Sequence, residues 1–179
     1  LMPEQILQMF LNEWSRDDTL RTALDLLPLV LPIILWGALP RLRKRGQSLL
    51  VLFGFFVGLH ALLTAYSLVF QGPETAAFYG WEFSRFLSLL GLFHAAAGIG
   101  LLACLGLGRP EWTKGLLIAL ALHAAASGVL HLIEVFAHRR VSLAHLGPPL
   151  WYDILAVVLT FWVLKKAESG PKPIYYVPR

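Results

Sequence analysis

The chain has 179 residues, of which 57% are hydrophobic and only 15% are charged. A soluble domain is usually about 25% charged, so this composition excludes an ordinary soluble protein and indicates an integral membrane protein. The single cysteine, Cys104, excludes internal disulfides, a Cys-x-x-Cys-His haem attachment and a thiolate metal cluster built by this chain alone. The net charge of +4 comes from basic residues beside apolar runs. That pattern relates to membrane orientation, and we expect no nucleic-acid partner.

Residues 1–18 are predicted to form an amphipathic helix that lies at the membrane interface. Apolar side chains recur there every three or four residues, and polar side chains fill the other face. The apolar face is formed by Ile6, Leu7, Phe10, Leu11 and Trp14. Docking onto a partner membrane subunit, or onto a second copy of the chain, is the alternative use of this face. Asp17 and Asp18 are positioned to cap the helix that follows.

Five apolar segments within residues 19–166 are predicted to span the bilayer, for which a helix needs about 20 residues. They are residues 19–39, 48–70, 81–107, 113–137 and 149–164. Pro28 and Pro32 are expected to kink the first span without breaking it. The fifth segment is the shortest. We therefore expect an all-α membrane protein, a five-span helical bundle, with an extended cytoplasmic tail over residues 167–179.

The distribution of basic residues predicts the orientation of this bundle. Three regions that flank the spans are basic. They contain Arg41, Arg43, Lys44 and Arg45; Arg109 and Lys114; and Lys165, Lys166, Lys172 and Arg179. The positive-inside rule places these regions in the cytoplasm and the N-terminus outside, although Arg139 and Arg140 oppose that orientation. We expect a bacterial inner membrane as the location.

Residues 113–137 carry a polar stripe along one face of an otherwise apolar helix. The stripe consists of His123, Ser127, His131 and Glu134, and His138 continues it at the membrane edge. At about 100° per residue, the spacing places the five side chains within roughly 80° of one another. Polar groups in a lipid-embedded helix are costly unless they face protein, water or a cofactor. This stripe is the strongest functional indication in the sequence.

A second polar stripe lies on the helix predicted over residues 48–70. His60, Thr64, Ser67 and Gln71 fall within an arc of roughly 60°. In the predicted orientation both stripes reach the outer side of the membrane. Two matched polar faces are best satisfied by a shared cavity, so the sequence predicts a pocket that opens to the non-cytoplasmic side. Mutual hydrogen bonding without a function is the alternative, since Ser and Thr often bond to their own helix.

His94, in the third predicted span, is a further histidine at mid-membrane depth. His94 is followed by Ala-Ala-Ala-Gly and His123 by Ala-Ala-Ala-Ser. Small residues allow a tetrapyrrole to approach the backbone beside an axial histidine, and they equally allow close helix packing. Both imidazoles are predicted about 20 Å from the outer ends of their spans. They are therefore the preferred pair of metal ligands, and His60 with His131 is a second, looser pair.

Three charged side chains lie near the outer ends of the predicted spans: Arg85, Glu134 and Asp153. Three charges on separate helices favour a structural network of paired groups. Glu134 differs because it shares the histidine face of its helix. There it is a candidate metal ligand, proton acceptor or orienting partner of His131. His131 and Glu134 are therefore the candidate catalytic residues.

Three classes of function remain open on these residues. In the first, His60, His94, His123 and His131 bind haem b or a chlorin in an electron-transfer subunit that passes electrons or quinol. In the second, a membrane enzyme uses His131 and Glu134 in acid–base or metal chemistry on a lipid-soluble substrate. In the third, the stripe carries a proton or another cation. The first class explains the most features, and the third lacks polar residues on the inner side of His123.

Overall fold

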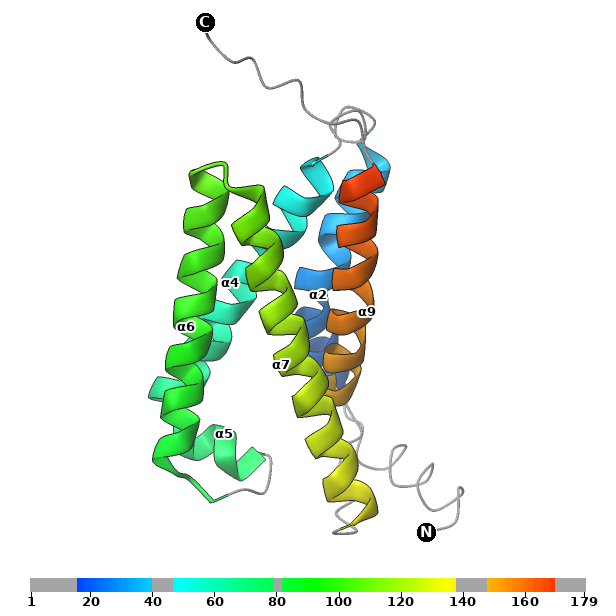
Figure 1. Cartoon of the computed structure of the whole chain (residues 1–179). Coiled ribbons are helices and arrows are strands. Elements are labelled where there is room, and N and C mark those ends of the chain that lie inside the picture. The colour runs from blue at the N-terminus through cyan, green and yellow to red at the C-terminus, as the bar shows by residue number, and fades with distance from the viewer. Residues whose placement is uncertain (1–15, 40–46, 79–81, 138–147, 170–179) are drawn as a thin grey trace, which may run out of the picture.

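The computed structural model describes residues 16–39, 47–78, 82–137 and 148–169. Within these ranges the chain folds into helices only, which confirms the all-helical class. The helices are α2 (Arg16–Ala38), α4 (Ser48–Phe70), α5 (Gly72–Phe78), α6 (Arg85–Gly106), α7 (Pro110–Phe136) and α9 (Pro148–Ser169). Figure 1 shows the long helices arranged as a bundle, with the short α5 across one end.

Three of these helices are long and apolar enough to cross a membrane, namely α4, α6 and α7. Large apolar side chains cover their outer surface and are more than half exposed. Examples are Leu63, Phe70, Phe86, Trp112 and Phe136. Such a surface is typical of a lipid-facing bundle. The apolar part of α2 is shorter, over Leu26–Ala38, and α9 carries charged residues, so the count of five spans stays a prediction.

The helix ends differ from the predicted segments for local reasons. α6 begins at Arg85 and not at residue 81, because Ser84 has the extended backbone of an N-cap residue (φ −137°, ψ 159°). α7 begins at Pro110, where proline suits the first helical turn. α9 continues to Ser169, so residues 167–169 belong to a helix and not to the predicted extended tail. Ala167 and Glu168, which occupy this part of α9, both favour helix.

Two further differences concern the start of the bundle and the end that α5 covers. α2 begins at Arg16, so the predicted boundary at residue 19 falls inside a helix. The remainder of the predicted interfacial helix and of the tail, residues 1–15 and 170–179, lies outside the described residues. α5 adds a helix to the predicted set, with Pro73 and Glu74 in its first turn. Its seven residues are too few for an apolar period to identify it.

Glycine residues set how closely neighbouring helices approach. A Cβ atom added to Gly98 of α6 would lie 2.8 Å from the carbonyl oxygen of Gly58 in α4, and one added to Gly91 would lie 2.7 Å from Val69 Cγ2. α6 therefore packs backbone against backbone on α4. Gly128 brings α7 close to α9, since a Cβ atom there would lie 3.5 Å from Asp153 Cβ.

An apolar core fills the half of the bundle near the α6–α7 connection. Its buried members include Leu50, Phe53, Leu101, Leu117 and Val163. The indole rings of Trp36 in α2 and Trp162 in α9 meet edge to face, 6.4 Å apart. This core closes one half of the bundle, and the polar residues of the two stripes lie in the other half.

Candidate functional site

One cavity of about 1090 Å³ lies among the helices of the second half. α2, α4, α6, α7 and α9 all contribute to its wall, and α5 contributes at its end. The polar lining from the predicted stripes and from α6 consists of His60, Thr64, Ser67, Gln71, His94, His123, Ser127 and His131. The structure therefore brings the second stripe and three members of the first, His123, Ser127 and His131, to a single cavity, together with His94.

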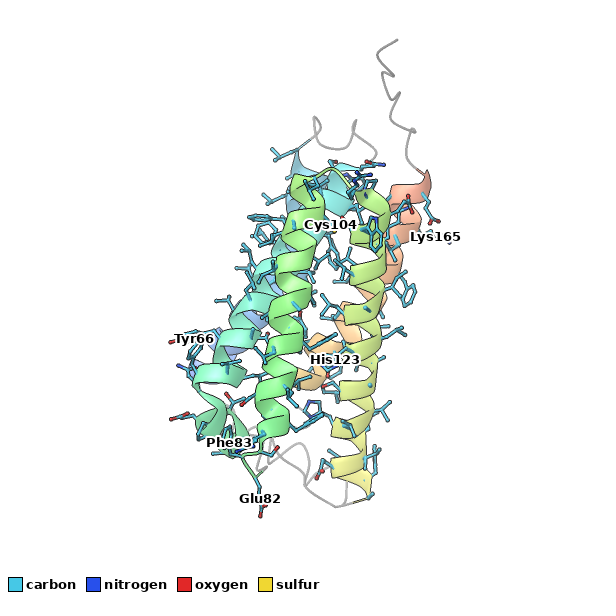
Figure 2. All side chains as sticks on the ribbon, turned by 60° about the vertical axis from the view of Figure 1, so that its left-hand side comes forward. Tyr66, Glu82, Phe83, Cys104, His123 and Lys165 are labelled. Carbon is cyan, nitrogen blue, oxygen red and sulfur yellow. The ribbon has the colours of Figure 1, made fainter. Side chains whose placement is uncertain are left out.

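The position of the cavity along the bundle follows from the labelled residues. In Figure 2, Cys104 lies near the α6–α7 connection, Glu82 and Phe83 lie at the opposite end, and His123 lies between these ends. Gln71, Glu74 and Thr75, at the junction of α4 and α5, also line the cavity. The Thr75 hydroxyl donates a hydrogen bond to the Ser67 carbonyl oxygen over 3.3 Å. The cavity therefore extends from the middle of the bundle to the end that α5 covers.

His94 and His123 are in direct contact inside this cavity. Their ring centres are 4.9 Å apart with an interplanar angle of 79°, and the Phe93 ring contacts both. His94 Nδ1 donates a hydrogen bond to the carbonyl oxygen of Leu90 over 2.9 Å. A donor at Nδ1 leaves the lone pair on Nε2, which is how metal-ligating histidines are commonly held.

The distance between these rings restricts how they could share a metal. With metal–nitrogen bonds of about 2.0–2.1 Å, two imidazoles on opposite sides of one ion have ring centres roughly 6 Å apart, and neighbouring tetrahedral positions give about 5 Å. The observed 4.9 Å is closer to the value for neighbouring positions than to the value for opposite ones, and the pair stays a predicted set of ligands. Among the described residues, no group of three or more His, Cys, Asp or Glu is arranged to hold a metal ion.

The other two histidines find partners on α9. The His60 ring stacks on the Tyr152 ring, with centres 4.5 Å apart and planes inclined by 29°. His131 Nε2 lies 4.0 Å from Asp153 Oδ2, and both side chains are buried. The looser His60–His131 pair that the sequence suggested stays a prediction, and each of its members contacts α9.

Asp153 is the residue whose role sequence reasoning underestimated. It was assigned to a structural charge network, whereas its carboxyl group lines the cavity beside His131. Ser127 contributes a side-chain hydrogen bond to the same carboxyl group. The available signal was an aspartate in the outer part of an apolar segment, at a depth similar to that of His131.

The remaining predicted site residues lie elsewhere. Glu134 is half-buried on α7, one turn beyond His131, and it is outside the lining of the cavity. Its catalytic role therefore stays a prediction. Arg85 is exposed at the start of α6. His138 lies outside the described residues.

These observations define a class, an all-helical membrane protein with a histidine-lined cavity inside its helical bundle. The chain belongs to a family of unknown function, DUF6790, which matches residues 19–172. This region contains every residue that lines the cavity. No curated protein and no solved structure matches the chain.

Proposed function

We propose that this protein binds a lipid-soluble, hydrogen-bonding small molecule in a cavity that opens to the non-cytoplasmic side of the membrane. One observation carries the proposal: histidines from α4, α6 and α7 converge on a single cavity within an apolar bundle. Imidazole nitrogens in an apolar environment favour polar partners, because their desolvation is costly. Four imidazoles that line one space therefore favour a ligand with polar groups of its own.

The size and lining of the cavity support a small molecule as the occupant. Binding pockets are typically about 300–1,000 Å³, mostly apolar, with a few polar groups that orient the ligand. The cavity has about this volume, and residues such as Leu87, Leu120 and Ala156 supply apolar walls between the histidines. The apolar core beyond it supports binding over conduction, because it offers no polar path across the other half of the bundle.

The charges at the two ends of the bundle support the proposed orientation. The α6–α7 connection, with Arg109 and Lys114 beside it, lies at the end that the apolar core fills, whereas α5, which contains Glu74, lies at the end with the cavity (Figure 1). Lys165 and Glu82 lie at these same two ends (Figure 2). Positive residues mark the cytoplasmic side. We therefore propose five spans, with the N-terminus and the mouth of the cavity outside and the C-terminus in the cytoplasm of a bacterial cell.

Cysteine labelling tests this orientation. Single cysteines at the exposed positions Pro73 in α5 and Glu168 in α9 are introduced after Cys104→Ala removes the native thiol. A membrane-impermeant maleimide is expected to label position 73 in intact spheroplasts and position 168 only after permeabilisation. The reverse pattern would turn the cavity toward the cytoplasm and contradict the proposed opening.

Identification of the bound molecule tests the proposed function itself. The protein is purified from its membranes into lipid nanodiscs, and organic-solvent extracts are compared by mass spectrometry with extracts of empty nanodiscs. We expect one compound at close to one molecule per protein. Recovery of bulk lipids alone, in their membrane proportions, would contradict the proposal.

A tetrapyrrole is a second candidate, favoured by the way His94 is held. Its Nδ1 is engaged by the Leu90 carbonyl, so Nε2 is available as one axial ligand of haem b or a chlorin. The turn of small residues after His94 gives a planar group access to the helix. A pigment bound in this way would make the protein a subunit for electron transfer. A quinol that enters the same cavity would then exchange electrons with the pigment.

Absorption spectroscopy separates this candidate from a colourless ligand. Haem gives a Soret band and a sharp α-band after reduction with dithionite, whereas a chlorin gives bands at longer wavelength. Replacement of His94 by alanine is expected to remove these bands. A featureless spectrum of the native protein would exclude the tetrapyrrole, and the colourless ligand would then be the function to pursue.

A further inference from the structure

We propose that His131 and Asp153 form a proton-binding pair on the wall of the cavity, suited to a ligand with a hydroxyl or carbonyl group. The pair takes up the proton of a ligand hydroxyl group, which leaves an oxyanion, and returns the proton to the same oxygen; to a carbonyl oxygen it donates a hydrogen bond, so no oxidant or reductant is required. This inference deepens the proposed function, on which it rests for the presence of a ligand. It identifies the ligand as one that exchanges a proton.

The geometry of the pair is the first argument. His131 Nε2 and Asp153 Oδ2 are 4.0 Å apart, and the two side chains are 3% and 11% exposed. Both residues nevertheless line the cavity. A titratable pair shielded from lipid but facing an internal cavity is placed to meet a ligand, not the bulk solvent.

The charge of the pair is the second argument. A single buried charge is strongly unfavourable, whereas a buried pair with no net charge is tolerated. The pair has two forms without net charge: a carboxylate beside an imidazolium, and a carboxylic acid beside a neutral imidazole. The two forms differ in whether one proton is bound at Nε2 or at Oδ2. Oδ2 is buried and accepts no hydrogen bond from the described residues. It is therefore an atom at which a proton or a ligand hydroxyl can bind.

The packing of α7 against α9 brings the two residues of this pair together. Gly128 allows Asp153 to approach α7, and Ser127 holds the carboxyl group by a side-chain hydrogen bond. His131 follows Ser127 by one turn of α7. The three side chains converge because α7 packs on α9 at the glycine, which gives the carboxyl group a fixed place.

The other titratable groups near the pair come from three helices. α7 contributes Glu134 one turn away, α9 contributes Tyr152 beside Asp153, and α4 contributes His60, which stacks on Tyr152. α2 contributes none over Leu26–Ala38. Gln71 and Thr75 line the outer end of the same cavity, which gives the pair a polar route for proton exchange with water.

Infrared difference spectroscopy of the protein in lipid bilayers, without added ligand, tests the pair directly. A pH change is expected to alter a carboxylic-acid C=O band, which shifts to lower frequency in heavy water. Asp153→Asn should abolish this band. Glu134→Gln, which removes the neighbouring carboxyl group of α7, should leave it in place. His131→Gln should change the pH at which the band appears, an effect that a purely structural role would not produce.

A milder variant keeps the test decisive if Asp153→Asn fails to fold. Ser127→Ala removes only a hydrogen bond to the carboxyl group, so the band should persist at a shifted frequency. A missing band in the native protein, or a band that responds only to Glu134→Gln, would overturn the inference. Because the band belongs to the protein and no ligand is added, this result is read independently of the nanodisc experiment. If the band is observed but no compound co-purifies, the proton-binding pair stands and the proposed binding function is refuted.

Discussion

Replacement of Thr64 by phenylalanine is expected to reduce the bound molecule at least about tenfold. Thr64 is half-buried on α4 and lines the cavity one turn from His60. A phenyl ring at this position would occupy space that the ligand needs. A tenfold loss corresponds to only about 1.4 kcal/mol, which is modest for steric exclusion. The measurement is the amount of the co-purified compound per protein, determined by mass spectrometry.

Leu59→Phe is the matched control for this variant. Leu59 is on the same helix, is 39% exposed and lies outside the lining of the cavity. The substitution introduces the same side chain where the ring can point into lipid, so the amount of bound compound should be unchanged. A folded Thr64→Phe protein with an undiminished amount of the compound would show that the ligand binds elsewhere.

Replacement of Gly98 by alanine is expected to destabilise the protein by about 1–3 kcal/mol, the usual effect of overpacking. The new Cβ atom would lie 2.8 Å from the Gly58 carbonyl oxygen and 2.9 Å from Leu62 Cγ. A backbone atom cannot move aside without shifting α4 against α6. The free energy of unfolding in detergent micelles, followed by circular dichroism, measures the effect.

Gly106→Ala provides the comparison on the same helix. A Cβ atom at Gly106 meets nothing within 4 Å, so only the backbone preference of the helix changes. Alanine is favoured over glycine there by roughly 0.5–1 kcal/mol, and this variant should be as stable as the native protein or slightly more stable. Equal destabilisation by both substitutions would contradict the close contact between α4 and α6.

The helices could be predicted from the sequence wherever apolar residues alone define them. The second predicted span, residues 48–70, coincides with α4. Prediction failed at ends that depend on local chemistry, such as the extended Ser84 before α6. It also failed for α5, which is too short to show a period. Apolar patterns report burial over several turns, whereas helix ends are set by single residues.

The candidate site was predictable only within each helix. The spacing of His60 and Ser67, or of His123 and His131, fixes their common face because helix geometry is constant. Which residues meet across the cavity depends on how each helix is rotated. The contact of Asp153 with His131 follows from the packing of α7 on α9 at Gly128. No repeat within one helix contains that information.

For His94 and His123, too, the position along each helix was predictable and the distance across the cavity was not. Their matched depth followed from the rise per residue, and the structure places their rings in contact. The distance between the rings depends on the separation of α6 and α7. This separation could not be calculated from the sequence, and the role of the two rings as metal ligands stays a prediction.

On the proposed function, Glu74 at the α5 end of the cavity is expected to disfavour some ligands before they reach the histidines. It is exposed in the first turn of α5 and also lines the cavity. An anionic amphiphile such as a fatty acid would meet a like charge there, a repulsion that dissolved salt screens because the carboxylate is exposed. The location of α5 thus makes the charge of a ligand a criterion for its entry into the proposed site.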